Sequence, residues 1–398
     1  MAATRRRAPR DIVSSIVAAG LGTLGATGAR AQTALDFKLL FYGEGNDRTQ
    51  VWNPELYLTH DFAEKGRLGV LLGYDSISGA SPTGEYPTLD ATASASSAGE
   101  IPMAQYTDTR LAATVSYERR LGAHLPSVDL SYSRESDYLS RGVAASDSWT
   151  LFGGRSTLHF GAGITRDIVE PVNMTESFDK SSDSISAGWT QIFGPRDLFD
   201  VSLSLTNLKG YLNDPYKVVP IGDTTVPEVR PDSRSRRAVV FKYGHHFLSR
   251  GALKVSYRWY GDDWSVRANT LDLVYDQRIG SRWILTPTLR LYSQGAAAFY
   301  AFEFATPQTY MTSDYRLSEF WSWQGGLGAS YAMTPQFSWN VAAQFLQQTG
   351  LDRVVPHTTG TPPPELREEG EEGEGGGRTL SPADLEQLTV TVGVSYRF

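Results

Sequence analysis

The sequence predicts an all-β chain that folds as a transmembrane antiparallel β-barrel of about 16 strands. Two observations carry this prediction. Apolar and polar residues alternate in about sixteen separate segments, and the connections between these segments fall into a short class and a long class according to their position in the chain. Alternation is the period of a strand with one apolar face, and a membrane barrel has short turns at one end and long loops at the other.

The last segment shows the strand pattern most clearly. From Leu388 to Phe398 every second residue is apolar, and Thr, Gly, Ser and Arg stand between them. An aromatic final residue suits a strand that ends at a membrane interface. Val394, Tyr396 and Phe398 resemble the C-terminal insertion signal of bacterial outer-membrane barrels. The resemblance implies that the barrel-assembly machinery and outer-membrane lipid are partners.

The other segments share apolar residues at alternate positions, which are the positions expected to face lipid. In chain order the expected strands contain residues 35–41, 56–62, 68–74, 111–117, 128–132, 149–151, 158–164, 185–189, 201–205, 239–243, 253–259, 271–275, 283–291, 321–331, 339–345 and 388–398.

The connections place the two ends of the barrel. Every link from an even to an odd strand is short: 63–66, 121–124, 153–155, 194–196, 249–251, 280–281 and 334–336. All the long links run from an odd to an even strand: 79–107, 167–181, 211–236, 295–316 and 350–384. Because periplasmic turns are short and outer loops long, both termini are expected in the periplasm of a Gram-negative cell, with the barrel in its outer membrane.

Bulk composition agrees with a barrel and excludes several kinds of site. Of the 398 residues 40% are hydrophobic, and mean hydropathy is −0.30. Such values suit a barrel, in which only alternate strand residues meet lipid. No run of 18 apolar residues follows Gln32, so no spanning helix is expected. The absence of Cys excludes disulfides, thiolate nucleophiles and Cys-based metal sites.

Residues 1–31 form a predicted signal peptide, and residues 32–398 the barrel domain. An arginine-rich start precedes a short apolar region over residues 12–24, and Ala29 and Ala31 form an A-x-A cleavage site. The alternative is a genuine N-terminal helix. Cleavage removes five Arg and one Asp, so the net charge changes from −7 to −11. This excess of acid argues against a nucleic-acid partner.

Tryptophans lie near the ends of the expected strands. Trp259, Trp264 and Trp321 lie near the loop end, and Trp283 and Trp339 lie near the turn end. Aromatic residues at these heights form the two interfacial girdles of a membrane barrel.

The inward face is polar and carries charges of both signs. The expected lumen-lining charges are Lys242, Lys254, Arg258, Asp272, Asp276 and Arg290. Lys254 is expected opposite Asp272, and Asp272 is expected to meet Arg290 diagonally. One interpretation is a charged pore wall that selects solutes. The other is a ladder of cross-strand ion pairs that keeps the wall rigid.

Two polar stretches are expected at the mouth of the barrel, leaving strand ends at Asp75 and Gly210. They are YDSISGASP, with Asp75, Gly79 and Pro82, and GYLNDPYK, with Asn213 and Asp214; Arg230-Pro-Asp232 follows. These stretches could form a packed structure at the mouth, bind a cation through Asp75, Asn213 and Asp214, or simply make turns. Together they resemble an uncharacterised family of Gram-negative proteins with a domain of unknown function. The resemblance implies an outer-membrane barrel and brings no substrate.

The leading function hypothesis is a porin-like channel for small hydrophilic solutes. The alternative is a plugged structural or assembly barrel whose outer loops bind a partner. An outer-membrane hydrolase, acting through a residue such as His159 or Asp263, is the third. No G-x-S-x-G or H-E-x-x-H motif occurs, so no catalytic residue, metal site or cofactor is expected.

Overall fold

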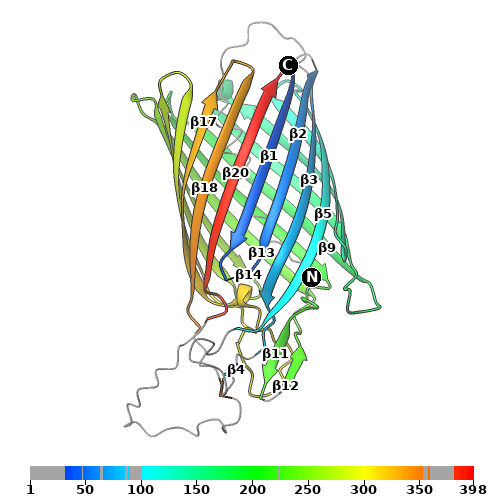
Figure 1. Cartoon of the computed structure of the whole chain (residues 1–398). Helices are drawn as coiled ribbons and strands as arrows, with labels where there is room; N and C mark the ends of the chain where they lie inside the picture. The colour runs from blue at the N-terminus through cyan, green and yellow to red at the C-terminus, as the bar shows by residue number, and fades with distance from the viewer. Residues whose placement is uncertain are drawn as a thin grey trace.

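Sixteen antiparallel strands close into one barrel (Figure 1). The computed structural model describes residues 32–46, 48–62, 66–85, 88–89, 101–222, 224–352, 357–358 and 381–398. Neighbours around the ring follow the order of the chain, and β20 pairs with β1 to complete the closure. The predicted fold class and number of strands are confirmed. The predicted signal peptide, with Ala29 and Ala31, lies outside the described residues.

The barrel strands contain 11 to 17 residues, enough to cross a membrane when tilted. They are β1 (Gln32–Glu44), β2 (Gln50–Phe62), β3 (Gly66–Pro82), β5 (Met103–Arg119), β6 (His124–Arg134), β7 (Tyr138–Leu151), β8 (Ser156–Val169), β9 (Phe178–Ile192), β10 (Asp197–Gly210), β13 (Ser233–His246), β14 (Gly251–Asp262), β15 (Arg267–Ile279), β16 (Trp283–Gln294), β17 (Phe320–Ala332), β18 (Phe337–Gly350) and β20 (Leu385–Arg397).

The two ends of the barrel differ as the sequence predicts. At the turn end, all seven connections between barrel strands are short, and one contains the 3-10 helix η1 (Phe152–Gly154). The backbone N–H of Phe398 donates to the carbonyl of Thr33 there, at 2.9 Å. The long connections all lie at the opposite, loop end (Figure 1). Gln32 and Phe398 therefore lie at the end that carries the short turns.

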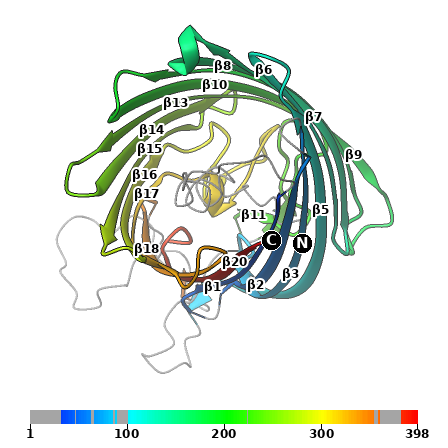
Figure 2. The ribbon, with the colours of Figure 1, turned by 90° about the horizontal axis from the view of Figure 1, so that it is seen from above.

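The loop-end connections contain further short elements. They are β4 (Thr88–Leu89), β11 (Val218–Ile221), β12 (Thr224–Pro227), the 3-10 helix η2 (Tyr315–Leu317) and β19 (His357–Thr358). β11 and β12 form a small hairpin, and β4 pairs with β19. Seen along the barrel axis, the segment with η2 lies within the ring of strands (Figure 2). Within the described residues, no helix is long and apolar enough to span a membrane.

The outward face is apolar and exposed, as lipid contact requires. Leu111, Ile185 and Leu327 are 57–58% exposed. Trp259 and Trp321 are also exposed, whereas Trp264 is only 4% exposed. The prediction that Trp264 belongs to a lipid-facing girdle is therefore wrong. The short loop after β14 turns inward, and Trp264 packs there with Val266, Ala297 and Leu317.

Strand β3 is longer than predicted. It runs through Asp75 to Pro82, because β5 pairs with it as far as Met103. The predicted exit at Asp75 is therefore wrong, whereas Gly210 is indeed the last residue of β10. Gly79 has φ +133°, and a Cβ built on it would lie 2.2 Å from the carbonyl oxygen of Arg48. Only glycine fits this close approach of two backbones.

Candidate functional site

The candidate site is the lumen together with the mouth at the loop end. Along the wall of β14–β16, inward residues make cross-strand ion pairs. Lys254 Nζ lies 2.7 Å from Asp276 Oδ2, and Arg290 Nε lies 2.6 Å from Asp272 Oδ1. Lys254 does not face Asp272, because the register places Ser256 opposite that residue. The predicted Lys254–Asp272 pair is thus wrong, and Arg290 meets Asp272 directly rather than diagonally.

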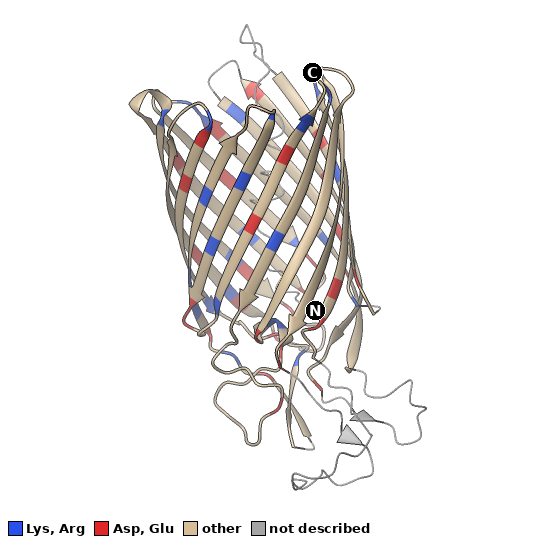
Figure 3. Cartoon of the chain, turned by 90° about the vertical axis from the view of Figure 1, so that its left-hand side faces the viewer, with Lys and Arg blue, Asp and Glu red and all other residues tan. Residues whose placement is uncertain are grey.

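Two other predicted lumen charges lie on the same side of the barrel. Lys242 on β13 is exposed and lies opposite Asp200 of β10. The guanidinium of Arg258 lies over the ring of Tyr260, 5.3 Å from its centroid. Basic and acidic positions are interspersed along the strands of the wall (Figure 3). Because the signs mix, their fields largely cancel along the lumen.

The wall formed by β7–β10 is built from small polar residues. Ser186 lies opposite Ser204 on one side and Gly161 on the other, and Gly161 lies opposite Ser146. These positions alternate with the lipid-facing Ile185 and therefore point inward. All three serines are nevertheless exposed. An inward side chain stays exposed only where no other part of the protein fills the interior beside it.

A hydrogen-bonded chain crosses this wall near the turn end. His159 Nδ1 lies 2.9 Å from Ser148 Oγ, and its Nε2 lies 3.0 Å from Thr190 Oγ1. Thr190 in turn donates to Asp200 Oδ2 at 2.7 Å. Both ring nitrogens are engaged, so the imidazole is a fixed part of the wall. The arrangement makes a polar ladder over four strands, each member of which has a partner.

A network of buried charges lies at the loop end. Arg230 donates to Glu228 Oε2 and to Asp314 Oδ2, both at 2.8 Å. Arg316 lies 2.5 Å from Asp214 and 2.6 Å from Asp314. Glu228, Asp214 and Asp314 are at most 3% exposed. The network joins the connection 211–232 to the connection 295–319, which are otherwise far apart in the chain.

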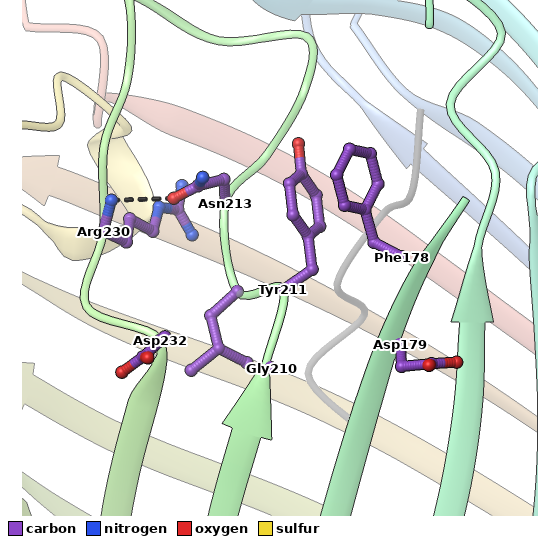
Figure 4. A pocket seen from close by; sticks show the side chains of 8 residues that line it. Phe178, Asp179, Gly210, Tyr211, Asn213, Arg230 and Asp232 are labelled. Atoms are coloured by element: carbon purple, nitrogen blue, oxygen red, sulfur yellow. Dashed lines mark hydrogen bonds between the residues drawn. The ribbon is translucent and has the colours of Figure 1, made fainter. Parts of the chain in front are cut away.

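The two mouth stretches singled out in the sequence meet in this region. Lys217 Nζ donates to Ser81 Oγ at 2.9 Å and to the carbonyl of Pro82. The backbone N–H of Arg230 donates to Asn213 Oδ1 at 2.7 Å (Figure 4). The stretches therefore pack against each other, which is the first of the three interpretations drawn from the sequence.

Burial shifts the titration of the network. Burial, followed by the charge of Arg316, lowers the pKa of Lys217 to about 8. Burial also raises the pKa of Glu228, against the opposing effect of Arg230. Burial alone would raise the pKa of Asp314, but Arg316 and Arg230 hold it well below its usual range. Arginines thus keep Asp314 ionised inside the protein.

The predicted cation ligands have protein partners. Asp75 accepts from Arg110 at 2.5 Å, and Asp214 and Asn213 belong to the network just described. A different group of described residues could hold a metal ion: Asp108, Glu135 and Asp137, with ligand oxygens within 4.8 Å of one another. Such hard oxygen ligands suit Ca²⁺ or Mg²⁺. The sequence analysis missed this group, because Asp108 lies on β5 and the others in the next loop-end connection.

Sequence reasoning also missed Glu228, Asp314 and Arg316. Their partners are separated by 84 and 102 residues along the chain. The sequence does offer one signal: Arg230 and Arg316 each have an acidic residue two positions before them. Nothing in that spacing identifies the partner.

A hollow of about 280 Å³ lies at the rim beside the network. It is lined by Phe178, Asp179, Gly210, Tyr211, Leu212, Asn213, Arg230 and Asp232. The rings of Phe178 and Tyr211 stack with centroids 4.2 Å apart (Figure 4). The hollow joins the end of β9 to the end of β10.

Comparison with known proteins agrees with this architecture. Residues 13–360 match a family described as "Protein of unknown function (DUF3570)". No curated protein matches the sequence. A structure titled "Bacterial polysaccharide outer membrane secretin" has a TM-score of 0.51 at 9% identity, covering 94% of this chain and all of that one. This likeness shows the fold alone.

Two further structures are similar at lower TM-scores. The CymD monoaromatic hydrocarbon channel has a TM-score of 0.42 and 12% identity, with 94% of this chain and 89% of that chain covered. The outer membrane protein opdK from Pseudomonas aeruginosa has a TM-score of 0.39 and 10% identity, with 93% and 99% covered. The predicted resemblance to an uncharacterised family of outer-membrane barrels is confirmed by the family match and the fold.

Proposed function

This chain belongs to the DUF3570 family of proteins of unknown function, and we propose that it is a porin-like channel. Small hydrophilic solutes would cross the outer membrane of a Gram-negative cell through its lumen, driven by their own gradients. The loop end would face outward and the turn end, with both termini, the periplasm. Val394, Tyr396 and Phe398 on the closing strand would be read by the barrel-assembly machinery.

One observation carries this proposal: three inward serines, on β7, β9 and β10, are exposed. Ser146, Ser186 and Ser204 would be buried if the interior were packed. A barrel of sixteen strands is also wider than its own wall side chains can fill. The small side chains of this wall leave room for a solute, and their hydroxyls can exchange hydrogen bonds with it.

The charged wall supports weak selectivity. Lys254 with Asp276 and Arg290 with Asp272 form neutral pairs at 2.6–2.7 Å. A paired wall presents little net field to a passing ion. The lumen should therefore pass cations and anions of similar size at similar rates. Passage requires no chemical step, so the proposed protein is a channel and not an enzyme.

The buried mouth supports a second candidate, a plugged barrel whose outer loops bind a partner. Glu228, Arg230 and Asp314 hold two connections together at the loop end. If these connections block the lumen completely, solutes cannot pass. The two candidates differ in one measurable property, which is conductance.

Single-channel conductance of refolded residues 32–398 in a planar bilayer tests the proposal. Steps of stable size are expected. Ser186→Trp places a large side chain in the lumen and should roughly halve the step. Ala187→Trp places the same side chain on the lipid face of the same strand and should leave the step unchanged.

Folding must be verified for each variant, by the change in gel mobility between boiled and unboiled samples. A folded protein that gives no steps contradicts the channel and favours the plugged barrel. Steps that respond equally to both tryptophans would show that the current does not pass along this wall.

A further inference from the structure

A row of basic side chains crosses the outer surface of the barrel at the loop end. Arg141 on β7 lies opposite Arg166 on β8, Arg166 lies opposite Ser181 on β9, and Ser181 lies opposite Lys209 on β10. These positions alternate with inward ones and share a face with the lipid-exposed Ile164. All three cations are exposed, and the side chain of Arg166 is 57% exposed.

The row lies at the loop-end edge of the exposed apolar band of these strands, and only the half-buried Leu139 and Ile168 lie beyond it on β7 and β8. Val143 and Ile164 are the last exposed apolar residues of the band, and Arg141 and Arg166 come two residues further towards the loop end. Two residues of strand rise by roughly 7 Å. The cations therefore stand where lipid headgroups begin.

A bound anion would stabilise this arrangement of positive charges. Arg141 and Arg166 lie directly opposite each other, and like charges so placed destabilise a sheet. Asp183 pairs with Arg166 at 2.9 Å. On the same outward stretch of β6–β10, four basic residues (Arg134, Arg141, Arg166 and Lys209) stand against two acidic ones (Asp179 and Asp183). The stretch keeps an excess of positive charge next to the membrane.

A groove of about 520 Å³ runs along the row. Outward residues that line it include Leu139, Arg141, Arg166, Ile168, Ser181 and Lys209. It shares Asp179 and Gly210 with the hollow of Figure 4, so the two lie next to each other at the rim. Besides the acidic Asp167 and Asp179, apolar and basic side chains line the groove, which suits a ligand with both acyl and anionic parts.

The spacing of the cations selects among anionic lipids. Arg141 and Lys209 stand on strands three steps apart, a span of roughly 14 Å. An arginine binds a phosphate with nitrogen–oxygen distances of about 2.8 Å, often through two hydrogen bonds. A single phosphate would therefore meet only one side of the row, whereas a headgroup with two or more phosphates can reach all three cations.

We propose that Arg141, Arg166 and Lys209 bind the headgroup of a lipid that carries more than one phosphate, in the leaflet at the loop end. The lipid would neutralise the facing arginines and tether this side of the barrel. The inference goes beyond solute passage, and it stands or falls separately from the channel.

Binding of lipid A, a bis-phosphorylated probe, to refolded residues 32–398 in detergent tests the proposal. Native mass spectrometry gives the bound fraction. Each cation near an anionic headgroup contributes about fivefold to affinity. The triple variant Arg141→Gln, Arg166→Gln, Lys209→Gln should therefore bind roughly a hundredfold more weakly. Its conductance should equal that of the parent.

The matched control removes three exposed arginines from the turn end: Arg119→Gln, Arg155→Gln, Arg196→Gln. It has the same net charge as the loop-end variant and should keep full binding. Equal losses in both variants would show general charge attraction and overturn the proposal. Unchanged binding in the loop-end variant would also overturn it, as would full displacement of lipid A by millimolar inorganic phosphate, which would identify a free-anion site.

Discussion

The wall of the lumen and its loop-end mouth use charge in opposite ways. On the wall, towards the turn end, Lys254 and Asp276 pair while 39% and 25% of their side chains remain exposed. At the mouth, Arg230 and Asp314 pair with 6% and 2% exposed. Water screens the first pair, whereas the second can exist only because each charge has several partners. The comparison teaches that similar ion pairs lie on a solvated wall in one place and hold two loops together in the other.

Arg230→Met should break this contrast most strongly. It leaves Glu228 buried without its main cation and removes one of the two arginines that pair with the buried Asp314, which costs about 3–5 kcal/mol. Opening of the mouth should become roughly a hundredfold more frequent or greater. The rate of protease cleavage within residues 211–232 measures how often the mouth opens.

The control is Arg67→Met, which removes an arginine paired with Asp61 at 2.6 Å but 51% exposed. It should change stability by less than about 1 kcal/mol. Similar cleavage rates in the two variants would show that the buried network does not hold the mouth.

Lys217 makes the mouth sensitive to pH. Its pKa in the folded protein is about 8, against an ordinary value of 10.5. Between these values the unfolded chain holds a proton that the folded chain has lost, so stability should rise with pH, by at most on the order of 3 kcal/mol. Urea unfolding at about pH 7 and about pH 10 should show this gain relative to Lys217→Met. If stability rises with pH by the same amount in Lys217→Met, the rise is caused by another group.

Gly79→Ala tests the backbone contact beneath the mouth. The residue has φ +133°, and a Cβ would lie 2.2 Å from the carbonyl of Arg48. The cost should be about 1–3 kcal/mol in urea unfolding. Gly73→Ala on the same strand is the comparison, because its Cβ would meet only Glu55 at 3.9 Å. Equal stability of the two variants would mean that β3 can shift away from Arg48.

Of these variants, Lys254→Met should change the stability of the protein least. This result would sharpen the contrast between the lumen wall and the mouth. The exposed pair contributes less than about 1 kcal/mol, and Asp276 keeps its hydrogen bond from Thr286 at 2.8 Å. Urea unfolding should hardly change. The reversal potential under a salt gradient should move modestly towards cation preference, since one acidic side chain loses its counter-charge. A destabilisation as large as that of Arg230→Met would remove the distinction between the two regions.

The barrel could be predicted because each strand carries its own signal. Alternation in a segment such as 201–205 is local, and the sorting of short and long links adds a check on the count. Register is not local, which is why the sequence predicts Lys254 opposite Asp272, whereas the structure pairs it with Asp276. The tight loop after β14 sets that register through backbone geometry that composition does not reveal.

The mouth could be predicted only in part. Asn213, Asp214 and Pro82 stand out as unusual residues, and the structure places their two stretches in contact. Trp264 was misplaced, because a tryptophan near a strand end suits either a lipid girdle or a packed loop. Partners such as Glu228 and Thr312, joined at 2.6 Å across 84 residues, depend on the folded path of two loops.

The seam between β1 and β20 has a consequence for how the chain must fold. It pairs Ala34 with Arg397, so ring closure joins residues from opposite ends of the polypeptide. Such a long loop is entropically costly to close before the intervening hairpins have formed. Until β20 docks, β1 and β18 each present a bare row of backbone donors and acceptors, and such rows recruit other chains. A chain interrupted before Leu385 should therefore aggregate rather than form a smaller barrel.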